Sequence, residues 1–215
     1  MATGTGLMAP GSIDWESGME CDWTSDSHSW LLPTTMVRLG LTKYAELRLE
    51  YDGSLDKDGD HWRYNVQPLV IGTKLRACDG HGWVPDISIM ANLSIPCTKA
   101  LTDEMHVAPQ IYALFNNDIN EHFSIGYNVG AEWNGVSTKP IAFVAVCLGA
   151  GITDHLGAFL ESYNYFGHGD AQCCADFGLN YMLTDRLQLD VNAGLPFCHP
   201  RDGAFVGIGV AWQIK

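Results

Sequence analysis

Apolar and polar residues alternate with a period of two along most of the chain. In AELRLEYD, residues 45–52, apolar side chains occupy the odd positions and charged side chains the even positions. The same alternation returns in DISIMANLSI at 86–95, in FSIGYNVGAEW at 123–133 and in LQLDVNAGL at 187–195. Because successive side chains of a β-strand point to opposite faces, this pattern predicts strands with one apolar and one polar face.

Counting such runs predicts about twelve strands, and no convincing helical periodicity is visible. We expect the strands roughly at residues 12–22, 29–39, 44–52, 62–77, 84–95, 106–116, 121–133, 139–151, 156–166, 171–183, 187–195 and 203–213. An even number of antiparallel strands can close with both termini at one end of a barrel. The pattern therefore predicts an all-β fold, a single antiparallel up-and-down β-barrel of outer-membrane type. It forms one domain over residues 1–215, and residues 1–10 are expected to be a flexible N-terminal segment.

Short polar turns recur between pairs of predicted strands. The segments LTKYAELRL, INEHFSIGY, ITDHLGAFL and LTDRLQLDV each place such a turn directly before an alternating strand. The intervening connections, such as DGSLDKDGDHW and PFCHPRDGA, are longer and less regular. Short turns at one end and long loops at the other are typical of outer-membrane barrels.

In a membrane barrel the apolar face meets lipid and the polar face lines the lumen, whereas a soluble barrel reverses this arrangement. The charged residues predicted to line the lumen are Asp14, Glu16, Glu20, Arg38, Glu46, Arg48, Glu50, Asp176 and Asp190. The aromatic residues predicted to form girdles at the membrane interfaces are Trp15, Trp133, Tyr181 and Trp212. The alternation alone also allows a soluble barrel that carries a ligand in its interior.

Composition narrows the function classes. Lys and Arg number 12 against 25 acidic residues, a formal charge of -13, which argues against nucleic acid as a partner. Hydrophobic residues make up 47% of the chain, but no apolar run reaches the length of about 18 residues that a membrane-spanning helix needs. Only a barrel could carry this chain across a bilayer.

Several segments together resemble the family of outer-membrane transporter-like proteins named Putative MetA-pathway of phenol degradation. They are APGSIDWESG, LPTTMVRLGLTKYAELRLEYD, ISIMANLSIP, ADFGLNYMLTDRLQLDVNAG and FVGIGVAW. The resemblance covers nearly the whole chain from about residue 10. It implies a β-barrel of the bacterial outer membrane that passes small, often apolar molecules.

The resulting functional prediction is an outer-membrane channel or transporter for small molecules, whose acidic lumen favours cations or neutral solutes. Its partners would be the lipid bilayer and small apolar or cationic solutes. An alternative is a structural subunit that associates with copies of itself through its outer face, at the cell surface or in an extracellular assembly. In a further alternative the lumen charges only neutralise one another and fill the barrel.

The sequence gives little support for catalysis or for metal or cofactor binding. We find no convincing catalytic motif and no ligand spacing typical of a metal site, so no enzyme activity, metal or cofactor is expected. The chain has seven cysteines. Cys21 near the end of the first predicted strand and Cys198 in the last long loop become neighbours when the barrel closes, which makes a disulfide between them a candidate.

Overall fold

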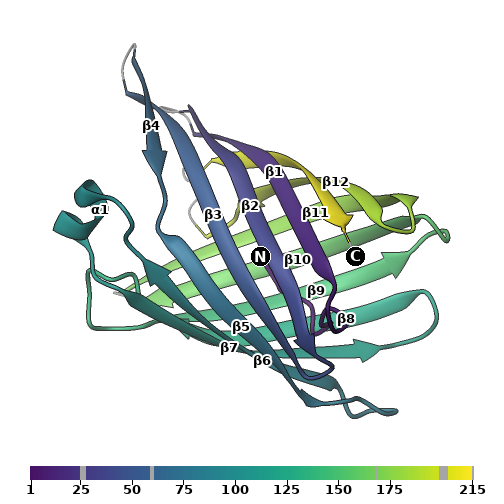
Figure 1. Ribbon diagram of the computed structural model, residues 1–215. Coiled ribbons are helices and arrows are strands. Elements are labelled where there is room, and N and C mark those ends of the chain that lie inside the picture. The colour runs from purple at the N-terminus through teal and green to yellow at the C-terminus, as the bar shows by residue number, and fades with distance from the viewer. Residues whose placement is uncertain (25–27, 59–60, 168, 199–202, 215) are drawn as a thin grey trace.

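The computed structural model describes residues 1–24, 28–58, 61–167, 169–198 and 203–214 (Figure 1). These residues form thirteen strands and one short helix. In chain order the elements are β1 (Ile13–Trp23), β2 (His28–Thr42), β3 (Ala45–Asp58), β4 (His61–Val66), β5 (Leu69–Cys78), β6 (Asp86–Ile95), α1 (Lys99–Glu104), β7 (Ala108–Asp118), β8 (Phe123–Glu132), β9 (Ile141–Gly151), β10 (Leu156–Gly167), β11 (Asp170–Thr184), β12 (Leu187–Pro196) and β13 (Ala204–Gln213).

Antiparallel pairing closes the sheet into a barrel. Most wall strands pair with their neighbours in the chain, β3 pairs with β5 as well as β2, and β1 pairs with both β2 and β13. Strand β4 pairs only with β3, so twelve strands form the closed wall and β4 is an addition. Figure 1 shows the ends of β3 and β4 rising beyond the rest of the wall. The predicted barrel of about twelve strands is confirmed.

The prediction of one strand over 62–77 is wrong, because the structure divides this range into β4 and β5. Pro68 lies between them, and proline has no N–H to donate to a ladder. Before it, the Gln67 N–H donates to the Asp52 carbonyl at 2.9 Å. The divided chain lets β3 run on past residue 52 and pair with β4.

Helix α1 was not predicted, since its six residues are too few to show a helical period. The Thr98 side chain caps it by accepting the N–H of Leu101 at 3.3 Å. None of the described helices is long and apolar enough to cross a membrane.

The two faces of the wall differ as in a membrane barrel. On β3, Leu47 and Leu49 are 41% and 42% exposed, whereas Glu46 and Arg48, which alternate with them, are 0% and 6% exposed. The same inversion recurs on β6, where Ile89 and Leu93 are exposed while Ser88 is buried. A water-soluble barrel would bury the leucines. The outer face is therefore an apolar band, and the interior is polar.

The first strand begins and the last strand ends at the end of the barrel that carries the short turns. The Ile214 N–H donates to the Ile13 carbonyl at 2.9 Å, and the Gln213 N–H donates to Arg186 in the β11–β12 turn. The other end carries the longer β6–β7, β8–β9 and β12–β13 connections. This asymmetry follows the pattern of turns in the sequence.

Candidate functional site: the barrel lumen

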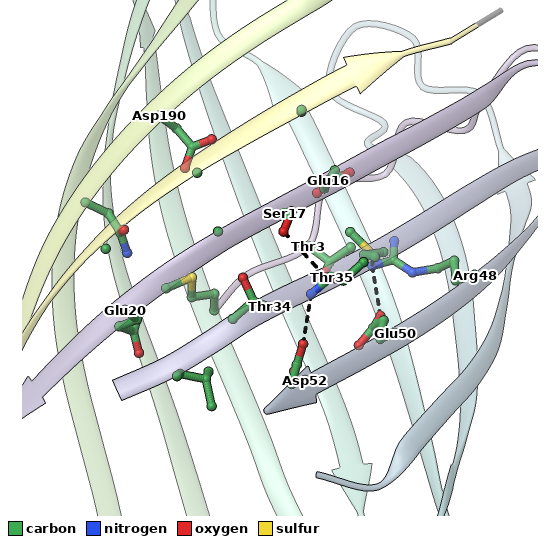
Figure 2. Close-up of a pocket in the computed structure, with 18 of the residues that line it drawn as sticks. Thr3, Glu16, Ser17, Glu20, Thr34, Thr35, Arg48, Glu50, Asp52 and Asp190 are labelled. Carbon is green, nitrogen blue, oxygen red and sulfur yellow. Dashed lines mark hydrogen bonds and ion pairs between the residues drawn. The ribbon is translucent and has the colours of Figure 1, made fainter. Parts of the chain in front are cut away.

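The barrel encloses a cavity of about 720 Å³. Strands β1, β2, β3, β12 and β13 line one side of it, and β6 to β10 line the other. Figure 2 shows Glu50 and Asp52 of β3 on the same wall as Glu16 of β1, with Asp190 on β12 beyond them. Within the described part of the chain, its charged lining residues are Asp14, Glu16, Glu20, Glu50, Asp52, Glu132 and Asp190, with Arg38 and Arg48.

The two lining arginines are paired with carboxylates. Arg38 Nη1 lies 3.4 Å from Glu16 Oε1 and 3.8 Å from Asp14 Oδ2. Arg48 Nη2 lies 3.3 Å from Glu50 Oε1, an ion pair drawn in Figure 2. These pairs offset the positive charge on this side of the cavity, so the arginines do not make the lumen basic.

Glu46 is the centre of a buried charge cluster near the short-turn end. Its side chain is fully buried, and Arg38 donates to both of its oxygens, at 3.1 and 3.0 Å. Arg48 and Lys74 each have a nitrogen 3.5 Å from Glu46 Oε1. A buried carboxylate is tolerated only when partners of this kind compensate for its lost hydration.

The N-terminal segment, defined here as residues 1–9, lies inside the barrel. It enters beside Gly40, whose carbonyl accepts the Gly11 N–H at 2.8 Å. From there it crosses the lumen, because its Met8 N–H donates to Glu46 on β3 and its Ala2 N–H donates to Glu161 on β10. The sequence predicts a flexible segment over 1–10 but gives no indication that it fills the lumen.

Wall side chains between these two points bind the segment as well. Lys74 Nζ on β5 donates to the carbonyls of Gly4 and Gly6, both at 2.9 Å. Ser88 Oγ on β6 donates to Thr5 O at 2.8 Å. Asn128 Nδ2 on β8 donates to the Thr3 carbonyl at 2.9 Å. The segment thus narrows the passage and leaves the cavity beside it.

An aromatic cluster lies where the segment begins. Tyr112 and Phe143 meet edge to face with centroids 5.6 Å apart, and Tyr165 lies 5.0 Å from Phe143. Ala2 packs against this cluster. The Tyr112 hydroxyl donates to Glu132 Oε1 at 2.8 Å, so the polar tip of the ring faces the cavity while its body is buried.

Strands β10 and β11 carry a pair of buried carboxylates, Glu161 and Asp176. Glu161 and Asp176 are register partners and only 5% and 1% exposed. Neither oxygen of Asp176 has a hydrogen-bond partner within the described residues, although Asn192 lies beside it. No ion pair involves Glu20 or Asp190 in the part of the chain that the structure describes, and both line the cavity.

All nine predicted lumen residues lie on the inner side of the barrel wall, but not all of them line the cavity. Seven of the nine line the cavity, whereas Glu46 and Asp176 are buried against the wall. The alternation does not single out Lys74, Ser88, Asn128 and Glu161 as contacts of the N-terminal segment. The alternation does assign these four residues to the polar face of their strands, so a list of all inward polar positions would have included them.

The predicted girdle residues lie at both ends of the barrel. Trp15 and Trp212 are register partners on β1 and β13 at the short-turn end, where Tyr181 also lies, opposite Leu156 at the start of β10. Trp133 follows β8 at the long-loop end and donates its Nε1–H to Thr138 O at 3.1 Å. Their role at a membrane interface stays a prediction.

The predicted Cys21–Cys198 disulfide is replaced by a different pair. Cys198 is bonded to Cys173 on β11, with the two Cα atoms 5.2 Å apart, and Cys21 is free. The chain leaves β12 toward β11 rather than β1, because the Phe197 N–H donates to the Cys173 carbonyl at 2.9 Å. This contact places Cys198 over Cys173.

A closed barrel with an apolar outer band and a charged interior defines the class of bacterial outer-membrane β-barrels. The chain belongs to the family Putative MetA-pathway of phenol degradation, whose model matches residues 2–214. The resemblance seen in the sequence is thereby confirmed. A comparison with curated protein sequences gives no match.

Solved structures of similar fold include outer-membrane channels and porins. An outer membrane channel from Pseudomonas putida F1 has a TM-score of 0.73 and 10% identity, and the match covers 97% of each chain. The NanC porin has a TM-score of 0.67 and 11% identity over 94% of this chain and 100% of its own. The KdgM porin, solved in complex with disordered oligogalacturonate, has a TM-score of 0.66 and 11% identity over 95% and 99%. At these identities the likeness establishes the fold.

Proposed function

We propose that this chain is an outer-membrane channel for small molecules, with an acidic lumen that favours cations or neutral solutes. The observation that carries the proposal is the cavity of about 720 Å³ within the closed wall, lined by charged side chains among which carboxylates predominate. Fixed charge of one sign along a narrow passage raises the local concentration of counter-ions and repels ions of like charge.

The distribution of ion pairs supports a preference for cations. The cavity's two arginines are compensated by neighbouring carboxylates, as Arg38 is by Glu16 and Asp14. Glu20 and Asp190 have no such partner in the described part of the chain and leave negative charge facing the cavity. The net charge of the cavity lining is therefore negative. A permeating cation would take the place of the positively charged partner that Glu20 and Asp190 lack.

The N-terminal segment sets the size of solutes that we expect to pass. It crosses the lumen from β3 to β10 and occupies space that a simple open pore would leave to water. The remaining space suits single small molecules better than folded or branched ones.

Planar-bilayer recording of the purified, folded barrel tests the proposal. With a gradient of KCl across the bilayer, we expect a measurable conductance and a reversal potential of the sign given by a more permeant K⁺. A folded barrel that gives neither conductance nor solute flux would contradict the channel. A conducting barrel with a Cl⁻ preference would contradict the acidic-lumen part alone.

The two alternatives predict different behaviour in solution. A soluble ligand carrier would be a stable monomer without detergent, and a self-associating subunit would form ordered polymers visible by negative-stain microscopy. That the chain is not an enzyme also stays a prediction.

A further inference from the structure

The hydrogen bonds between the lumen wall and the N-terminal segment all end on main-chain atoms of the segment. Lys74 donates to Gly4 O and Gly6 O, and Ser88 and Asn128 donate to Thr5 O and Thr3 O. Glu46 and Glu161 accept the main-chain N–H groups of residues 8 and 2. These wall groups therefore contact amide groups that every peptide possesses, and not the side chains of this particular segment.

The contacts follow one another along the segment, which bends at Thr5. The even-numbered carbonyls of residues 4 and 6 go to Lys74, while the odd-numbered carbonyls of residues 3 and 5 go to Asn128 and Ser88. Donors on different strands thus satisfy successive carbonyls of the bent segment, and Arg38 on β2 donates to Gly6 O as well, at 3.2 Å. The wall therefore provides a track of donors for the main chain of a short peptide.

The track also has room for other side chains. A Cβ atom built on Gly4 or on Gly6 would have no heavy atom within 4 Å, and neither glycine has a positive φ. Residues larger than glycine could occupy both positions without strain or collision. The fit of the segment therefore does not depend on its two central glycines.

Three of the wall side chains that donate to the segment are buried and belong to strands of the barrel. Lys74, Ser88 and Asn128 are 2%, 0% and 1% exposed. Asn128 Oδ1 has no hydrogen-bond partner within the described residues, so its amide group still offers an acceptor for a peptide N–H. Buried donors and acceptors without partners are costly, so a vacated track favours a new occupant that supplies amide groups.

We propose that this wall, formed by β3, β5, β6, β8 and β10, is a binding site for short peptides, of which the N-terminal segment is the resident occupant. Peptides of other sequences bind there once the segment is displaced. This deepens the proposed channel by naming oligopeptides as a class of solute, and it rests on that function for passage only.

The test uses the full chain, folded before the segment is released. A recognition site for a specific protease is inserted between Pro10 and Gly11, which are both exposed. After folding in detergent the chain is cut and the released segment is washed out. Two dye-labelled nonapeptides serve as probes, one with the sequence of residues 1–9 and one with alanine at positions 4 and 6 and serine at 3 and 5. Binding is measured by fluorescence anisotropy.

We expect the cut barrel to bind both peptides with affinities within roughly threefold of each other, and the uncut barrel to bind neither. Because a hydrogen bond to a charged group contributes more than a neutral one, Lys74→Met should weaken binding by about tenfold or more. Lys99→Met is the matched control, since Lys99 lies on α1 and pairs with Asp103 away from the track. N-methylation of the peptide at residue 8 removes the donor to Glu46 and should also weaken binding, with no change to the protein.

Failure to bind either peptide overturns the proposal. It is also overturned if only the native sequence binds, since the wall would then recognise side chains, or if Lys74→Met and N-methylation both leave the affinity unchanged. Peptide binding is measured independently of ion conduction, so the two proposals can fail separately. A cut barrel that conducts ions but binds no peptide overturns this inference and leaves the channel intact, whereas binding without any conductance supports the site and contradicts the channel.

Discussion

The carboxylate of Asp190 on β12 lies against the backbone of Gly209, its register partner on β13. A methyl group added at Gly209 would lie 2.5 Å from Asp190 Oδ1, and one added at Gly207 would lie 2.3 Å from Asn192 Oδ1. Glycine on the neighbouring strand thus lets an inward polar side chain lie along the wall. This arrangement keeps the cavity wide beside β12 and β13.

Replacing Gly209 by alanine should therefore move the Asp190 carboxylate off the wall and toward the cavity. The colliding atoms are the mobile end of a side chain, so we expect the barrel to fold, with a stability change below about 1 kcal/mol. Single-channel conductance should fall, since the displaced carboxylate narrows the passage. Current recordings, together with the temperature at which the folded band is lost in electrophoresis, check both expectations.

Gly18→Ala is the matched control for that variant. Its methyl group would lie 2.6 Å from the Ile208 carbonyl oxygen, a main-chain atom of β13 that cannot rotate away. The seam between β1 and β13 must then shift, at a cost of roughly 1–3 kcal/mol. Equal loss of stability in the Gly18 and Gly209 variants would show that the Asp190 side chain does not move aside to avoid the added methyl group.

The direction of side chains could be predicted from the sequence, whereas their long-range partners could not. The alternation around Arg48 assigns each residue to a face, because the strand period depends only on neighbours in the chain. Asn128 is assigned to the polar face in the same way. Its partner Thr3 lies 125 residues away, and a local pattern carries no information about such a contact.

The partner of Cys198 in the disulfide could not be predicted from the sequence pattern either. Closing the barrel brings the β12–β13 loop near both of the flanking strands, β1 on one side and β11 on the other. The sequence does not say toward which strand the loop turns. In the structure, residues 197 and 198 turn toward β11, where the Phe197 N–H donates to the Cys173 carbonyl.

Removing this disulfide should destabilise the barrel, and removing Cys21 should not. The bond joins residues 25 apart, and the loss of such a cross-link costs roughly 3 kcal/mol by loop-closure entropy. We expect Cys198→Ser to lower the unfolding temperature to that of the reduced wild-type chain, and Cys21→Ser to have no effect. Mass spectrometry of unreduced fragments should recover a Cys173–Cys198 peptide. Recovery of a Cys21–Cys198 peptide would contradict the pairing described above.

Adjacent residues on β12 can distinguish a lipid-facing outer surface from a water-facing one. Val191 is 43% exposed and lies between Leu179 and Ile208 on the outer face, whereas Asn192 points into the lumen. Arginine at an outward position near the middle of a bilayer costs about 2–4 kcal/mol. We therefore expect Val191→Arg to reduce folding into lipid vesicles by that amount, and Asn192→Arg to be tolerated. If both variants fold equally well, the outer face does not meet lipid.

Four lining carboxylates have no ion-pair partner in the described part of the chain, namely Glu20, Asp52, Glu132 and Asp190. Asp52 and Glu132 accept hydrogen bonds from Thr35 and Tyr112, so we expect ion selectivity to depend most on Glu20 and Asp190. Neutralising these two, as Glu20→Gln with Asp190→Asn, leaves Arg38 and Arg48 with their existing carboxylate partners and removes two of the four unpaired carboxylate charges from the cavity. We expect the K⁺ preference to fall toward equal permeability for K⁺ and Cl⁻, and the remaining preference to weaken further at high salt, where charges are screened.

Reversal potentials in a KCl gradient measure this change, and Glu104→Gln serves as the control. Glu104 ends α1 at the long-loop end and is exposed, so Glu104→Gln removes one formal negative charge, against two in the double variant, at a distance from the cavity lining. The control should keep the wild-type reversal potential. A double variant that conducts with unchanged selectivity would show that the preference arises elsewhere, for instance at Asp52 and Glu132, which also line the cavity, or at the buried pair of Glu161 and Asp176.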